Sequence, residues 1–241
     1  MNFAASEWEF RYRFWIFASF YWICFSLYRI DHTNLGLAVT RFFYRDVPGA
    51  VTYSTLRPVY LAGVSLAVLA ALIRTWATAY IRPEVMTDGE LHTHTVIAEG
   101  PYRYVLNPLY LGTNLMAFVY AVLASRLGAL VLASTTMLFN YRIILREERE
   151  LALVQGENYE RFRRAVPRLL PSLHPHVSGS ERKPNWGAGL LGEMFFWGLA
   201  LALLVFALTF NARAYFLALG LTFGIYFLCL GLIGRLRQTR P

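Results

Sequence analysis

Charged residues and cysteines are both scarce in this chain of 241 residues. Asp, Glu, Lys and Arg make up 16% of the sequence, whereas hydrophobic residues make up 56%. So little charge argues against a soluble core and favours a polytopic membrane protein. The two cysteines, Cys24 and Cys229, lie far apart within apolar stretches, so a disulfide framework is not implied.

Other features are missing as well: an internal repeat, a Gly-rich dinucleotide-binding fingerprint and a separate basic domain. The net charge is +8, but the basic residues cluster beside the apolar stretches. Membrane orientation and anionic lipid headgroups explain this placement. We therefore expect membrane lipids, and not nucleic acid, as partners.

About six apolar runs have the length of roughly 17–22 residues that a bilayer core requires. They cover residues 13–28, 58–80, 108–125, 127–146, 190–210 and 214–234. The predicted fold is therefore an all-α, polytopic membrane protein with about six transmembrane helices. An even number places both termini on one side, and most of the 23 Lys and Arg residues would share that side. The positive-inside rule makes it the cytoplasm.

A polar, turn-rich segment at residues 92–112, HTHTVIAEGPYRYVLNPLYLG, leads into the third apolar run. Its Asn107-Pro108 step predicts a helix start. Asn can cap free backbone N–H groups, and Pro is tolerated at the first helical position.

Residues 108–125 and 127–145 would each span about 27–29 Å and form an antiparallel hairpin. Glu147 and Glu148 would then return to the level of Asn107. The hairpin thus predicts a polar site at the cytoplasmic base of the third and fourth helices.

Residues 100–112, GPYRYVLNPLYLG, resemble the G-P-Y-x-x-x-R-H-P-x-Y-x-G signature of the integral-membrane methyltransferases. That superfamily includes isoprenylcysteine carboxyl methyltransferase and the phospholipid N-methyltransferases. A second stretch, from Glu147-Glu148 to the Val-Pro-Arg at 166–168, resembles the superfamily's E-E-x-x-L…G-x-x-Y…V-P-R-x-x-P ending. The two motifs stand in the superfamily's order, one helical hairpin apart.

The resemblance implies S-adenosylmethionine as methyl donor and a lipid or lipophilic small molecule as acceptor. Glu147 and Glu148 would accept hydrogen bonds from the donor's amino group or ribose. The helix start at Asn107, with Arg103 or Arg168, would hold its carboxylate. The expected catalytic residues are Arg103, Asn107 and Glu148. The expected cofactor-binding residues are His92, Gly100, Pro101, Tyr102, Asn107, Pro108, Tyr110, Glu147, Glu148, Tyr159 and Arg168.

Leu106-Asn107 stands where the superfamily usually has Arg-His, so one cation and one titratable ring are absent. Arg103, or His92 and His94, would take over part of their role. If the missing Arg grips an anionic group, a Leu106→Arg substitution should be tolerated.

The acidic pair and the aromatic residues also have purely structural explanations that do not involve a ligand. Glu147-Glu148 would be a solvated helix end with Arg146 and Arg149 as partners, although acids at a helix C-terminus oppose the dipole. Likewise, Trp76 and Tyr80 suit a headgroup-level aromatic belt better than an aromatic wall around a sulfonium.

Metal binding is not expected. His92-x-His94 and His174-x-His176 lie on the same predicted face, but metal-binding tracts are usually denser or include cysteine or carboxylate ligands at close spacing.

The chain divides into residues 1–91 with the first two helices, 92–186 with the methyltransferase-like core, and 187–241 with a C-terminal transmembrane hairpin. Gly156 is expected to end the fourth helix, and residues 155–183 to form a cover that admits and encloses a ligand. Gly220 and Gly224 have the spacing for close helix approach, within the monomer or in a homodimer.

Two other functions fit the architecture less well. A NADPH-dependent membrane reductase of the sterol-reductase type would not need a Gly-rich fingerprint. A transporter would be expected to carry charge at mid-membrane, whereas here the charges lie at the ends of the runs.

Overall fold

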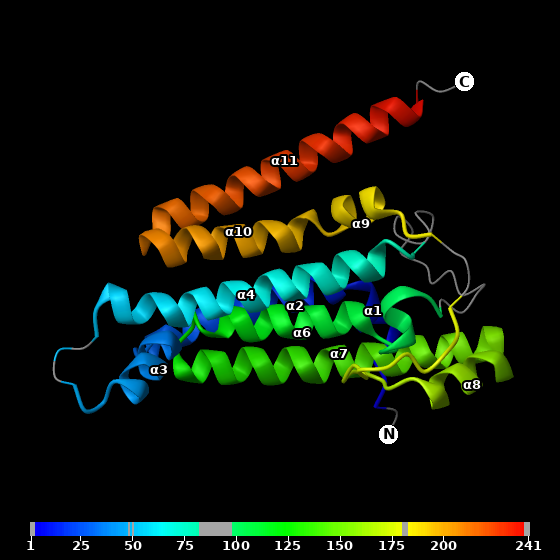
Figure 1. The fold of residues 1–241 in the computed structure, drawn as a ribbon, viewed down its shortest axis with the longest axis horizontal. Coiled ribbons are helices and arrows are strands. Elements are labelled where there is room, and N and C mark those ends of the chain that lie inside the picture. Colours follow the sequence, from blue (N-terminus) through cyan, green and yellow to red (C-terminus); the bar gives the residue numbers. More distant parts are fainter. Residues whose placement is uncertain (1–2, 48, 50, 82–97, 180–182, 239–241) are drawn as a thin grey trace.

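Figure 1 shows the computed structural model, an elongated bundle of helices. It describes residues 3–47, 49, 51–81, 98–179 and 183–238. Across these ranges the regular structure is helical, and they contain no strand. The all-α prediction is therefore confirmed.

The α-helices are α1 (Glu7–Arg11), α2 (Arg13–Ser26), α3 (Leu35–Phe43), α4 (Tyr53–Thr78), α6 (Pro108–Ala121), α7 (Arg126–Gln155), α8 (Glu157–Ala165), α9 (Trp186–Gly192), α10 (Met194–Thr209) and α11 (Ala212–Gln238). Two short 3-10 helices are η1 (Leu27–Arg29) and η2 (Gly100–Arg103).

Helices α2, α4, α6 and α7 form the centre of the bundle, while α10 packs on α4 and α11 lies outermost, against α10 (Figure 1). Ala67 and Ala70 of α4 share one buried cluster with Ala117 and Ala121 of α6. Such small side chains let helix backbones approach closely, which matters in a membrane because association there depends on packing. This contact brings the end of α4 beside the start of α6.

Among the residues that the structure describes, three helical segments are long and apolar enough to cross a membrane: α4, α7 and residues 212–231 of α11. A fourth span results if α9 and α10, which are bent by 60° at their junction, are counted together. Helices α2 and α6 have 14 residues each, or about 21 Å by helix rise, which is short of a bilayer core. The membrane architecture is confirmed, and the number of six spans stays a prediction.

The predicted hairpin of residues 108–146 is present as α6 and α7. The Ser125 side chain accepts a hydrogen bond from the Gly128 N–H (3.0 Å) and caps α7. Gly156 adopts a φ of 56° and ends α7, as expected. The last turns of α7 therefore carry Glu147 and Glu148 back to the start of α6.

The N-terminal segment docks on this same end of α7. The Ala5 N–H donates to the Arg142 carbonyl (2.9 Å), and the Arg142 Nη2 donates to the Glu9 carboxylate (2.8 Å). α1 therefore lies against the part of α7 that leads to the acidic pair.

The C-terminal hairpin does not use its Gly-x-x-x-Gly spacing for packing within the monomer. A Cβ added at Gly220 or Gly224 would meet nothing within 4 Å. Instead, Gly198 of α10 lies directly against Thr222 of α11. Of the two alternatives for Gly220 and Gly224, the structure does not show packing within the monomer, because α11 contacts α10 through Thr222.

Candidate functional site

Asn107 immediately precedes α6, whose first residue is Pro108, so the predicted helix start is confirmed. The predicted cap is wrong, because the Asn107 side chain makes no capping hydrogen bond to the helix. Its Nδ2 donates instead to the Arg168 carbonyl (3.1 Å). Asn107 therefore connects α6 to the segment that follows α8.

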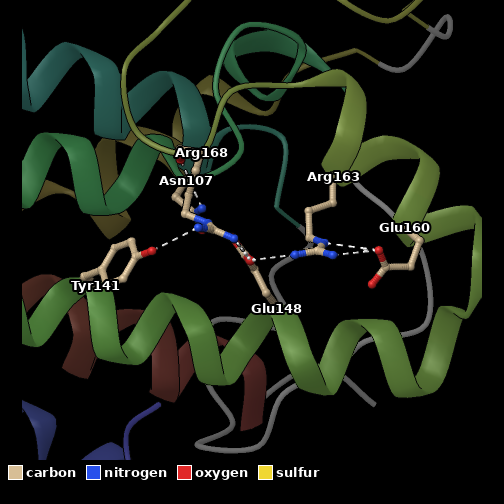
Figure 2. Close-up of polar contacts among 6 residues, drawn as sticks. All are labelled: Asn107, Tyr141, Glu148, Glu160, Arg163 and Arg168. Carbon is tan, nitrogen blue, oxygen red and sulfur yellow. Dashed lines mark hydrogen bonds and ion pairs between the residues drawn. The ribbon is translucent and has the colours of Figure 1, made fainter. Parts of the chain in front are cut away.

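Glu148 and Arg168 form a bidentate ion pair at this point (Figure 2). Arg168 Nε donates to Glu148 Oε1 (2.7 Å), and Nη2 donates to Oε2 (2.8 Å). Hydrogen bonding to the Glu148 carboxylate raises the pKa of Arg168. A third donor of Arg168, Nη1, reaches the Tyr141 hydroxyl at 3.1 Å.

The Glu148 side chain is only 5% exposed, so it is not the solvated helix end that the simpler explanation requires. Arg146, one of the partners expected there, pairs with Glu150 (2.8 Å). Arg163 of α8 lies 3.9 Å from Glu148 and hydrogen-bonds Glu160 (Figure 2). Two cations from the cover segment thus converge on one buried carboxylate.

Tyr110 and Glu147 form a second contact between α6 and α7. The Tyr110 hydroxyl donates to Glu147 Oε1 at 2.6 Å. Within the part of the chain that the structure describes, this is the hydrogen bond that Glu147 accepts, so Oε2 remains able to accept another. Burial raises the pKa of the nearby Tyr102, and the negative charge of Glu147 adds to that shift, so the Tyr102 phenol stays neutral.

An apolar cluster closes the site on the side of α8. Leu106 packs with Tyr159, Phe162 and Val166, and its N–H donates to the Pro167 carbonyl (2.8 Å). Burial also raises the pKa of Tyr159, and Glu148 contributes to that rise. Leu106 thus lies under the cover and not toward an anionic ligand, so the expectation that Leu106→Arg is tolerated finds no support in this packing.

Arg103 contacts the cover segment through its side chain and its backbone. Its Nε donates to the Val177 carbonyl (3.0 Å), and its own carbonyl accepts from the His176 N–H (2.9 Å). Arg103 therefore secures the cover segment, while Arg168 is the cation beside Asn107.

The packing around η2 explains why its first two residues are Gly100 and Pro101. Gly100 adopts a φ of 53°, and an added Cβ would collide with the Tyr80 ring. Pro101 is buried. Trp76 packs on Tyr104 with ring centroids 6.0 Å apart. The aromatic residues at the end of α4 thus support η2.

His92 and His94 lie outside the described residues. His174 and His176 are exposed. Among the residues that the structure describes, no group of three potential metal ligands comes together.

One polar cluster escaped the sequence analysis. Arg74 of α4 and Glu193, between α9 and α10, form a buried ion pair with N–O distances of 2.6 and 3.1 Å. The sequence does indicate such a pair, because Glu193 falls inside the apolar run 190–210 and Arg74 inside the run 58–80. A charge within an apolar run needs a partner in a membrane.

Residues 58–157 match the family model described as phospholipid methyltransferase. This range contains most of α4 and all of η2, α6 and α7, and hence both acids of the candidate site.

Two curated relatives are methanethiol S-methyltransferases. The protein of Crocosphaera subtropica is 39% identical over 70 residues, which are 29% of this chain and 27% of that protein. The protein of Pseudomonas deceptionensis is 34% identical over 93 residues, which are 39% of this chain and 33% of that protein. The chain therefore matches a third or less of the length of each relative. No solved structure matches the chain significantly.

Proposed function

We propose that the protein transfers a methyl group from S-adenosylmethionine to a lipophilic acceptor at the membrane interface, because residues 58–157 match the family model of phospholipid methyltransferases. The observation that carries the proposal is the junction of Asn107, Glu148 and Arg168. It joins the two sequence motifs through hydrogen bonds, at the end of the hairpin where both were expected.

The residues present suit the methyl donor. Its amino group is a cation with several N–H donors, and Glu147 Oε2 can accept from it. Its carboxylate suits the first turn of α6, where backbone N–H groups have no partner within the helix and the dipole is positive. Tyr102, held neutral by burial, can donate or accept a hydrogen bond beside Glu147.

Glu148 has a different role from the one expected. Both of its oxygens bind Arg168, so it holds that cation and the cover segment in place. We assign Glu147 to direct contact with the donor and Glu148 to positioning.

When bound, S-adenosylmethionine supplies an activated methyl group on a sulfonium. Transfer to a sulfur, nitrogen or oxygen is a one-step displacement, so the protein chiefly aligns the reactants and excludes water. Tyr110 fixes the Glu147 carboxylate, and the apolar cluster around Leu106 and Tyr159 excludes water from the α8 side. A lipophilic acceptor would enter laterally from the bilayer.

The acceptor class follows from the names of the relatives. The curated relatives are methanethiol S-methyltransferases, and the family model is that of phospholipid methyltransferases. A small thiol and an ethanolamine phospholipid are therefore the two acceptors to test first. The comparisons give no support to a reductase.

The test uses full-length protein purified in detergent. A ligand that binds the folded state raises its melting temperature, so S-adenosylhomocysteine should stabilise the protein and NADPH should not. Labelled S-adenosylmethionine should then transfer its methyl group to methanethiol or to phosphatidylethanolamine vesicles. Stabilisation by NADPH alone would refute the assignment.

A variant makes the test specific for the site. Glu147→Gln keeps the size of the side chain and removes its charge, so it should weaken S-adenosylhomocysteine binding by about 1.5–3 kcal/mol. Glu157→Gln, at an exposed position of α8, is the matched control and should bind as the wild type. Equal binding by both variants would remove Glu147 from the donor site.

A further inference from the structure

A second buried ion pair, between Arg74 and Glu193, lies beside the candidate site and contacts the first turns of α6. Glu193 is 3% exposed and stands at the 60° bend between α9 and α10. Arg74 binds both of its oxygens, and the Thr78 hydroxyl donates to Oε1 (2.6 Å). The carboxylate is thus fully engaged by α4, so it is a structural partner of Arg74 and not a ligand contact.

Arg74 continues from this pair to the first turns of α6. Its Nη1 donates to the Leu109 carbonyl (2.9 Å) and to the Thr113 hydroxyl (2.8 Å). The guanidinium carbon lies 3.9 Å from the centre of the Phe196 ring, in a cation–π contact. One side chain therefore connects α4, α6 and α10.

Gly112 is the reason that Arg74 can pass along α6. An added Cβ at Gly112 would collide with the Arg74 side chain and approach the Ala70 carbonyl at 3.0 Å. Only a residue without a side chain leaves this path open. Gly112, the last residue of the 100–112 motif, thus leaves the space that the Arg74 side chain needs to reach Glu193.

The residues that Arg74 holds bracket the site. Leu109 and Thr113 flank Tyr110, whose hydroxyl binds Glu147, and Leu109 is two residues from Asn107. We propose that Glu193, acting through Arg74, is a positioning residue for donor binding and that the C-terminal helices thereby form part of the methyltransferase. The proposal rests on the proposed function.

The contacts of the Arg74–Glu193 pair explain how it would position the start of α6. The two hydrogen bonds that Arg74 donates to the Glu193 carboxylate fix the plane of the guanidinium. A fixed guanidinium directs Nη1 at the Leu109 carbonyl. Loss of Glu193 frees Arg74, so the first turn of α6 loses its anchor on α4. Asn107 and Tyr110 are then no longer held in their positions relative to α7.

The main test removes the pair as a unit. A double variant, Arg74→Met with Glu193→Met, leaves no unpaired charge, and replacing a buried pair by apolar residues is often neutral for stability. Its melting temperature without ligand should stay near that of the wild type. Its dissociation constant for S-adenosylhomocysteine should rise about tenfold, as for loss of an orienting partner. The KM of the acceptor should not change.

The matched control is Trp197→Phe. It removes the hydrogen bond from Trp197 Nε1 to the Thr75 hydroxyl (3.0 Å) at the same contact of α4 with α10, and leaves Arg74 untouched. It should bind S-adenosylhomocysteine as the wild type. A purely structural role of the C-terminal helices would lower the folded fraction in both variants and leave the dissociation constant of the folded protein unchanged.

The outcomes separate the two proposals. Wild-type protein that fails to bind S-adenosylhomocysteine would overturn the proposed function and this inference with it. Wild-type binding together with equal binding by the double variant would overturn the inference alone. If the double variant does not fold, Thr113→Val replaces it, because it removes a single contact of Arg74. Binding about threefold weaker is then expected, and unchanged binding would overturn the inference.

Discussion

Glu148 of α7 binds the Arg168 side chain with both carboxylate oxygens, and the Arg168 backbone carbonyl accepts a hydrogen bond from Asn107. The ends of the hairpin are therefore connected by the segment that follows α8. Any change in the charge of Glu148 must affect the helix start and the cover together.

Glu148→Gln should be more damaging to stability than to chemistry. The variant leaves Arg168 half-buried without its ionic partner, which costs roughly 3–5 kcal/mol for a buried pair. Arg168 is partly exposed, so the expected loss is at the lower end of this range. Thermal unfolding of purified protein measures it. Exposed Glu157→Gln is the control, and a Glu148→Gln variant as stable as that control would show that the pair contributes nothing.

Leu106→Arg should destabilise the protein, because it would place a charge in the apolar cluster with Tyr159, Phe162 and Val166. Leu106→Met conserves volume and should cost less than about 1.5 kcal/mol. Melting temperatures of both variants test this. An Arg variant as stable as the Met variant would mean that the cover opens away from Leu106.

Gly112→Ala should lower stability by about 1–3 kcal/mol, the usual cost of overpacking, since the new methyl group collides with Arg74. Gly220→Ala is the comparison, because nothing lies within 4 Å of that position. Thermal unfolding of the two variants in the same detergent checks the difference. Similar losses in both would point to helix propensity and away from the contact with Arg74.

Asp31 gives a pH dependence that can be measured. A hydrogen bond from Arg126, followed by one from the Leu127 N–H, lowers the pKa of Asp31 to about 2. In the unfolded chain the pKa of Asp is about 3.9. The group therefore contributes stability above about pH 4, and this contribution is lost as the pH falls toward 2.

The comparison for Asp31 is the Asp31→Asn variant. Wild-type protein should melt at a higher temperature than the variant at pH 6, and the difference should shrink as the pH approaches 2. Asp46→Asn, at an exposed ion pair with Arg45, serves as control. A difference that stays constant over this range would show that Asp31 titrates alike in both states.

Both termini and the α8 segment should face the cytoplasm, because most Lys and Arg residues lie on that side. In a variant without Cys24 and Cys229, Glu157→Cys should resist a membrane-impermeant maleimide in intact cells. Asp46→Cys should react, because Asp46 follows α3, which lies at the opposite end of the bundle from α8 (Figure 1). The reverse labelling pattern would invert the topology.

Periodicity and turn chemistry predicted the helices well. The Asn107-Pro108 step, the turn at Ser125 and the break at Gly156 each lie where the sequence indicated, because local backbone preferences set them. The lengths of α2 and α6 and the bend at Glu193 were not predicted, since tertiary contacts decide where an apolar run stops being helical.

Side-chain partners were harder to predict than helices. Glu148 was expected either to meet the donor or to pair with its sequence neighbours, whereas its partner Arg168 lies 20 residues away. Arg74 and Glu193 are separated by 119 residues. Hydropathy identified the runs in which these charges lie, but pairing at such separation depends on how the helices cross, which no local pattern encodes.

The docking of α1 on α7 has a consequence for biogenesis. Ala5 and Glu9 leave the ribosome before Arg142, whose backbone carbonyl and side chain bind them. α1 therefore cannot complete its contact with α7 until residues up to Arg142 have been synthesised. The contact of α1 with α7 therefore forms late, because it joins residues that are 133 positions apart in the chain.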